Sequence, residues 1–136
     1  MNEKIESLYS QIAQKAIELI PTKWSKVLLY AEILPGVVTE VHYFIEEDTG
    51  KAIQFGDIPT TYQIERSEFN RKSLGLTKLI RQMNKEFVDC NQKMWTAMTF
   101  VLSSDGEFKI DYGYDNIEET DITIRRQQWE KKYLGL

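Results

Sequence analysis

The stretch TAMTFVLSSDGEFKIDYGYD, residues 96–115, decides how this chain folds. Alternate positions are larger residues on both sides of Asp105-Gly106: Thr96, Met98, Phe100 and Leu102 before it, and Phe108, Ile110, Tyr112 and Tyr114 after it. A period of two is typical of strands that bury one face, and Asp-Gly favours a two-residue type I′ turn. We therefore expect a β-hairpin with one buried face and one wet, acidic face.

Three further strands are expected upstream of this hairpin. Residues 24–34 are rich in Val, Leu, Tyr and Ile, Pro35-Gly36 marks a turn, and residues 37–46 alternate again. Two such runs across a short connection predict a second antiparallel hairpin. After a turn at 48–50, we expect a third strand at 51–55 and a loop at 56–62.

Helical spacing of apolar residues recurs in three segments. Residues 3–20 form the first, which Pro21 ends; the second covers about 66–91; the third begins at Asp121, a plausible N-cap, and runs to Leu134. Gly75 disfavours helix by about 1 kcal/mol relative to alanine, so the second could be two short helices. Trp129 and Tyr133 share the apolar side of the last helix and should pack on the sheet.

These elements predict an α+β fold in the order α-β-β-β-α-β-β-α. Hairpins flanked by helices indicate an antiparallel sheet of about five strands with helices packed on it. Because 136 residues is an ordinary length for one domain, we expect a single domain over residues 1–136.

Composition indicates a globular cytoplasmic protein. Hydrophobic residues make up 42% of the chain and charged residues 28%, and no apolar run reaches the length of a membrane helix. The start of the chain lacks the pattern of a signal peptide. Cys90 is the only cysteine, which suits a reducing compartment.

Residues for catalysis are few. His42 is the only histidine and has no ligand-spaced partner, and no phosphate-binding or nucleophile-elbow motif occurs. We therefore expect no catalytic residue, metal, cofactor or small-molecule substrate. A metal-dependent hydrolase is the alternative, built on Glu107, Asp111 and Asp115 along one strand, but a row does not converge on a metal as such a site requires.

The segment from Ser103 to Ile122 is strongly acidic. It has seven acids against the single base Lys109, a net charge of −6, within a chain of net charge −4. Such a segment repels nucleic acid and attracts basic partners. Our candidates for partner binding are therefore its outward-facing carboxylates: Glu107, Asp111, Asp115, Glu118, Glu119 and Asp121.

The helix at 66–91 and the residues just after it carry a basic face: Arg66, Arg71, Lys72, Lys78, Arg81, Lys85 and Lys93. No aromatic residues interleave with these charges, as a nucleic-acid stacking platform needs, and acids intervene. A solvated helix face is the favoured interpretation, with no nucleic-acid partner.

An ordered set of motifs resembles the YezG-like immunity proteins over nearly the whole chain. The N-terminal half contributes an amphipathic helix, Tyr30-Ala31-Glu32 and Tyr43-Phe44. The C-terminal half contributes Trp95, Phe100, Asp105-Gly106, Phe108, Asp111-Tyr112, Tyr114-Asp115, Arg126, Trp129 and Lys132-Tyr133-Leu134.

This resemblance implies a cytoplasmic antitoxin whose partner is a toxin exported by type VII secretion, commonly one with a nuclease domain. The family implies no catalytic residues. A row of carboxylates could mimic phosphates in a nuclease groove, or the inhibitor could distort the toxin fold; the residues leave both open. A secretion chaperone or other protein-interaction adaptor is the alternative function.

Overall fold

A computed structural model describes residues 3–117 and 120–136. The elements follow the predicted order: α1 Glu3–Leu19, β1 Trp24–Leu34, β2 Val37–Glu46, β3 Ala52–Gln54, α2 Ile58–Tyr62, α3 Arg66–Asp89, β4 Ala97–Ser103, β5 Phe108–Gly113 and α4 Ile122–Leu134. The strands form one antiparallel sheet, ordered β3-β2-β1-β4-β5. The predicted α+β class and strand pairing are confirmed.

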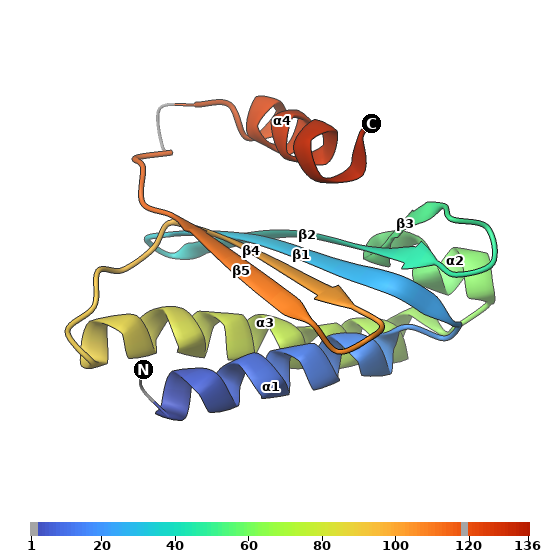
Figure 1. Ribbon diagram of the computed structural model, residues 1–136, viewed down its shortest axis with the longest axis horizontal. Helices are drawn as coiled ribbons and strands as arrows, with labels where there is room; N and C mark the ends of the chain where they lie inside the picture. The colour runs from blue at the N-terminus through green and yellow to red at the C-terminus, as the bar shows by residue number, and fades with distance from the viewer. Residues whose placement is uncertain (1–2, 118–119) are drawn as a thin grey trace.

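Helices cover both faces of the sheet. Figure 1 shows α1 and α3 together on one face, here named the inner face, and α4 alone on the opposite, outer face. Side chains of successive strand residues alternate between these faces. Val27, Leu29 and Phe44 therefore belong to the inner core, while Leu28 and Tyr43 belong to a second cluster under α4.

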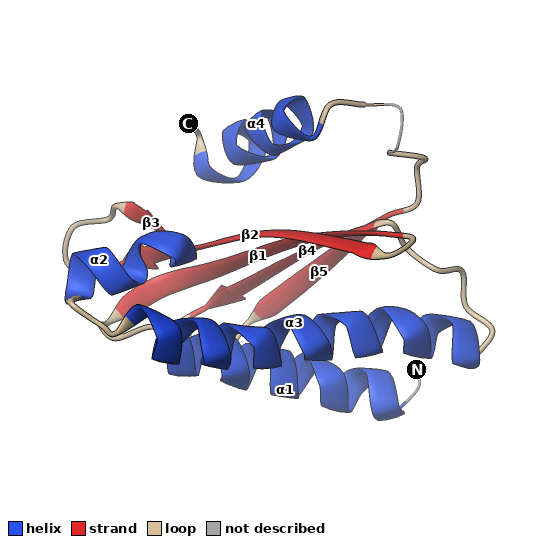
Figure 2. Ribbon diagram, turned by 180° about the vertical axis from the view of Figure 1, so that it is seen from behind, coloured by secondary structure: helices blue, strands red, loops and turns tan. Residues whose placement is uncertain are grey.

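The inner face holds the main core. Leu76, Ile80 and Met83 of α3 and Ile5 and Ile12 of α1 are fully buried there, and Figure 2 shows the two helices side by side beneath the strands. The helix predicted at 66–91 is continuous, although it contains Gly75. A Cβ at Gly75 would lie 2.8 Å from Cε of Lys15, near the end of a flexible side chain on α1, so Gly75 leaves room for that side chain.

Two local predictions were wrong. Residues 56–62 are not a loop: they belong to a short 3-10 turn, Phe55–Asp57, and to α2, which follows it. Pro59 suits the first turn of a helix, where its missing N–H has no intrahelical acceptor.

The β4–β5 turn is also not the predicted two-residue type I′ turn. Gly106 N donates to Ser103 O at 2.9 Å, and Ser103 N donates to Glu107 O at 2.8 Å, leaving a loop of three residues. Only Gly106 in this loop has a positive φ, +93°, whereas type I′ needs two such residues. The longer loop still pairs Phe100 with Ile110 and Leu102 with Phe108, so the apolar set shares one face as predicted.

No helix within residues 3–117 and 120–136 combines the length and apolar character that crossing a membrane would need.

Candidate functional site

The predicted partner-binding acids lie around β5 rather than along it. Asp111 is the one that lies within the strand. Glu107 is exposed directly before β5, where its main-chain oxygen accepts from Ser103 N at 2.8 Å. Asp115 is exposed two residues after β5 ends, where its main-chain oxygen accepts a hydrogen bond from Thr96 Oγ1 at 2.8 Å. The expected single-strand row of three carboxylates is therefore wrong, because β5 is too short to hold it.

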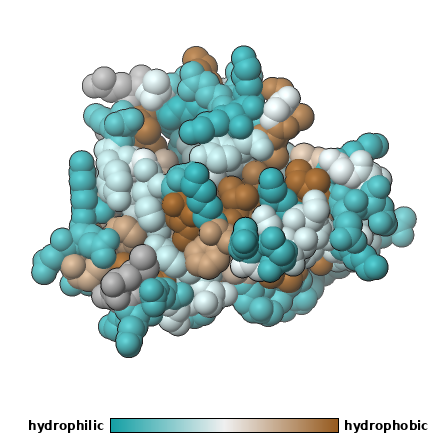
Figure 3. Space-filling view, in the orientation of Figure 1, coloured by the Kyte–Doolittle hydropathy of each residue, from teal (hydrophilic) through white to brown (hydrophobic). Residues whose placement is uncertain are grey.

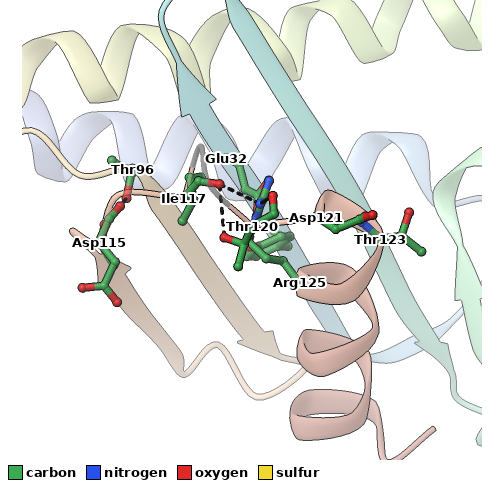
Figure 4. Close-up of polar contacts among 10 residues, drawn as sticks. Glu32, Thr96, Asp115, Ile117, Thr120, Asp121, Thr123 and Arg125 are labelled. Atoms are coloured by element: carbon green, nitrogen blue, oxygen red, sulfur yellow. Dashed lines mark hydrogen bonds and ion pairs between the residues drawn. The ribbon is translucent and has the colours of Figure 1, made fainter.

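The remaining candidates lie toward α4. Asp121 is the N-cap of that helix, as predicted, and its Oδ1 accepts from Thr123 N at 2.7 Å. Glu118 and Glu119 lie outside the described residues. The acids that the structure places thus lie at both ends of β5 and continue to the start of α4. Figure 4 shows Asp115 and Asp121 of this set.

The outer face beside Asp111 is not fully wet, contrary to expectation, because α4 covers part of it. Trp129 is only 6% exposed and packs over Leu28, Val41 and Tyr43. Its indole Nε1 donates to Thr99 Oγ1 at 3.0 Å. At the helix end, Tyr133 donates to Asp111 Oδ2 at 3.2 Å. The predicted packing of Trp129 and Tyr133 on the sheet is confirmed.

A buried ion pair fixes the start of α4. Arg125 Nε and Nη2 donate to the two carboxylate oxygens of Glu32 at 2.8 and 2.9 Å. The Glu32 side chain is 2% exposed and that of Arg125 13%. Nη1 of Arg125 also donates to the main-chain oxygens of Ile117, at 2.7 Å, and Thr120. Figure 4 shows this guanidinium between β1 and the segment that enters α4.

The electrostatics of this pair follow from its neighbours. Burial acts to raise the pKa of Glu32, but hydrogen bonds from Arg125 and Tyr30 outweigh it and lower the pKa below its ordinary value. Tyr30 donates to Glu32 Oε2 at 2.5 Å, and burial together with this hydrogen bond raises the pKa of Tyr30. Glu32 is therefore an ionised carboxylate with three charge-assisted hydrogen bonds.

Aromatic rings complete the contact between α4 and the sheet. The Trp129 ring centroid lies 5.1 Å from that of Tyr30, 6.1 Å from Tyr43 and 5.3 Å from Tyr133. Tyr43 also donates to the carboxylate of Glu130 on α4. Beside these rings runs a groove of about 360 Å³ between α4 and β1–β2.

Sequence reasoning missed the Arg125–Glu32 pair because its members are 93 positions apart. One signal was present. Glu32 is an acid in the otherwise apolar run from Val27 to Leu34, and it shares the strand alternation of Leu28 and Tyr30. A carboxylate at a buried strand position needs a partner, so a cation elsewhere in the chain could have been sought.

The side chain of His42 is held by hydrogen bonds within the fold. Its Nδ1 accepts from the main-chain N of Tyr30 at 3.2 Å, and its Nε2 lies 3.0 Å from Glu40 Oε1. Glu40 also accepts from Thr77 of α3. Both ring nitrogens are therefore engaged within the fold. Among the described side chains, no three His, Cys, Asp or Glu residues are grouped so as to hold a metal ion.

Comparison with known proteins adds an independent finding. The family described as "Immunity protein YezG-like" matches residues 5–136. Immunity protein YezG of Bacillus subtilis (strain 168) is 33% identical over 134 residues, covering 97% of this chain and 89% of that protein. Its namesake in Bacillus spizizenii is 29% identical over 98% of this chain and 84% of its own length. The type VII secretion system protein EsaG of Staphylococcus aureus is 26% identical over 95% and 80%.

Proposed function

Since this chain belongs to the YezG-like family of immunity proteins, we propose that it neutralises a secreted nuclease toxin by binding it directly in the cytoplasm. The family supports an antitoxin role, and immunity proteins of this kind generally act without catalysis. The name of the Staphylococcus relative links that protein to type VII secretion. We extend that link to the toxin of this chain.

One observation supports a nuclease as the target. The segment from Ser103 to Ile122 has a net charge of −6, and its described acids lie on exposed loops and on the edge strand β5. A nuclease must attract phosphates, so its substrate groove is basic. Carboxylates presented on this side of the immunity protein would meet that groove with complementary charge, which accelerates association and favours the correct partner.

The proposed complex has a characteristic size. A specific inhibitor interface buries about 1,600 Å² in total, roughly 800 Å² on each partner. Such an interface takes about 20–30 residues from each partner, more than the six of β5 or the 13 of α4. We therefore propose that the interface includes the acidic loops at both ends of β5, with Glu107 at one end and Asp115 and Asp121 at the other.

The test starts with partner capture. The chain, tagged at its exposed C-terminus, is used to capture partners from the cytoplasm of its native cell, and the captured proteins are identified by mass spectrometry. The proposal expects a toxin with nuclease activity, inhibited when the chain is added at one molar equivalent. The matched control is the chain with two charge reversals, Glu107→Lys and Asp115→Lys.

Two outcomes would contradict this function. A captured partner without nuclease activity would refute the nuclease assignment. A partner that remains fully active in the complex would instead favour the alternative, a secretion chaperone or adaptor. Metal-dependent cleavage of nucleic acid by the purified chain itself, lost in Asp111→Ala, would point to the hydrolase alternative.

A further inference from the structure

We infer that β5 is a docking edge at which an extended, basic segment of the toxin joins the sheet as a sixth strand. This inference rests on the proposed function and names the surface that would carry it. It concerns the main chain of β5 first and the acidic side chains second.

The position of β5 leaves one edge of the sheet open. It is the last strand in the order β3-β2-β1-β4-β5 and pairs with β4 only, among the described strands. In Figure 1, β5 lies between α1 and α4 on the near side of the molecule, with neither helix drawn across it. A strand of six residues, Phe108–Gly113, offers an edge as long as an average strand.

The hydrogen bonds between β4 and β5 identify which main-chain groups of β5 face the open edge. Ser103 N donates to Glu107 O, and Thr96 N donates to Gly113 O, each at 2.8 Å. Odd-numbered residues of β5 therefore face β4. In an antiparallel ladder the intervening residues point the other way, so the N–H and C=O groups of Phe108, Ile110 and Tyr112 face the open edge.

The edge also presents an exposed aromatic ring. Phe108 is 54% exposed, although its ring stacks on Phe100 at 5.6 Å and meets Tyr9 edge-on at 6.1 Å. Figure 3 shows apolar side chains between hydrophilic ones across the middle of this side of the molecule. Proteins usually protect open edges with lysine, proline or a bulge. Here Lys109 is the one such residue in the strand.

Charge selects the occupant. Asp105, Glu107, Asp111 and Asp115 surround this edge against Lys109. A second copy of this chain on β5 would bring two segments of net charge −6 together, and like charges opposite one another destabilise a sheet. A strand that alternates apolar side chains with lysine or arginine fits instead, its apolar side toward Phe108 and its cations toward Asp111.

The first test removes one outward main-chain donor. Phe108→Pro deletes the N–H that faces the open edge, at the first residue of an edge strand, where proline is tolerated. Phe108→Ala, the matched control, deletes the same ring and keeps the N–H. The inference expects Phe108→Pro to bind the toxin at least about tenfold more weakly than Phe108→Ala, since an edge hydrogen bond is lost and the incoming strand is obstructed.

A second control lies on the other edge of the sheet. Glu46 N donates to Lys51 O at 2.9 Å, so even-numbered residues of β2 face away from β1. Val38→Pro therefore deletes an outward N–H there, beyond the residues that pair with β3. Toxin affinity should be unchanged in Val38→Pro. A loss in Val38→Pro with none in Phe108→Pro would overturn the inference.

Hydrogen exchange on the wild-type chain covers the case in which a proline variant does not fold. In the toxin complex, the amides of Phe108, Ile110 and Tyr112 should gain at least about tenfold protection. Intact binding without that protection would overturn the strand-docking inference while leaving the antitoxin function standing. Failure to bind any toxin would instead remove the proposed function. Dimerisation of the chain alone, abolished by Phe108→Pro, would identify a second copy as the occupant and overturn the inference.

Discussion

The two faces of the sheet are held by different physics. Among the residues that the structure describes, the inner cluster contains 21 buried residues and the outer cluster four: Leu28, Val41, Tyr43 and Trp129. Burial of apolar area is non-directional and sums over many contacts. The outer face depends instead on one buried ring, Trp129, and on a few directed bonds, among them those of Arg125 to Glu32. The inner face should therefore set the global stability, whereas α4 should be able to loosen alone.

The largest effect should come from the inner face. Phe44 is completely buried against Phe55 and Tyr62, and Phe44→Ala should lower the free energy of unfolding by about 4 kcal/mol, as large truncations in cores do. Chemical denaturation followed by circular dichroism measures this. A loss below about 1 kcal/mol would mean that the inner face does not dominate stability.

Trp129→Ala tests the outer face. The expected cost is about 3 kcal/mol, at the low end for large buried aromatics, because the loss falls mainly on α4. Hydrogen exchange should show faster exchange in α4 than in α1. The control is Ile124→Ala, an exposed position on the same helix, which should change stability by less than about 0.5 kcal/mol. Equal loss of protection in α1 and α4 would argue against separate behaviour of the two faces.

Replacing one member of the ion pair should have a smaller effect. Arg125→Met leaves Glu32 buried without its cation, and we expect a loss of about 2 kcal/mol. This is less than the 3–5 kcal/mol of fully buried pairs, because α4 can lift and admit water. The double variant Glu32→Gln with Arg125→Met should recover part of the loss. An additive double variant would show that the two side chains are not coupled.

Acid should weaken the attachment of α4. The pKa of Glu32 is lower in the folded chain than in the unfolded one, so its stabilising effect is complete above the unfolded pKa and is lost as pH falls through the folded pKa. Exchange of α4 amides should therefore accelerate more in the wild type than in Glu32→Gln as pH falls below about 4. Parallel profiles would exclude Glu32 as the responsible group.

The smallest effect on stability should come from the exposed acids. Glu107→Lys and Asp115→Lys are combined in one variant, and each substitution should change the free energy of unfolding by less than about 0.5 kcal/mol. Association with the toxin should slow by at least about tenfold at low ionic strength, and the deficit should shrink as salt rises. The same charge change on α1, Glu6→Lys with Glu18→Lys, is the control. Association rates that match the wild type in stopped-flow measurements would show that the acids around β5 face solvent without steering the toxin.

The two faces also differ in how well sequence predicts them. Alternation in β4 and β5 and the stripe of α3 are local patterns, so the sheet, its pairing and the inner core could be read directly. The three-residue loop at Gly106 could not, because Asp-Gly suits more than one turn. The cover of the outer face depends on Arg125 meeting Glu32, 93 residues earlier, and on Trp129 meeting Thr99, 30 residues earlier. The helical spacing predicts that Trp129 packs on the sheet, but no local pattern encodes which strand residues it or Arg125 meets.

The sequence separation of Arg125 and Glu32 also has a consequence for synthesis of the chain. The ribosome makes Glu32 first and Arg125 93 residues later, roughly 5–20 s at ordinary elongation rates. Throughout that interval the nascent chain carries the Glu32 carboxylate between Leu28 and Leu34, on a strand whose outer face α4 does not yet cover. An unpaired charge at that point keeps the nascent strands hydrated and discourages aggregation between neighbouring chains. The Glu32 side chain then pairs with Arg125 when α4 has been made.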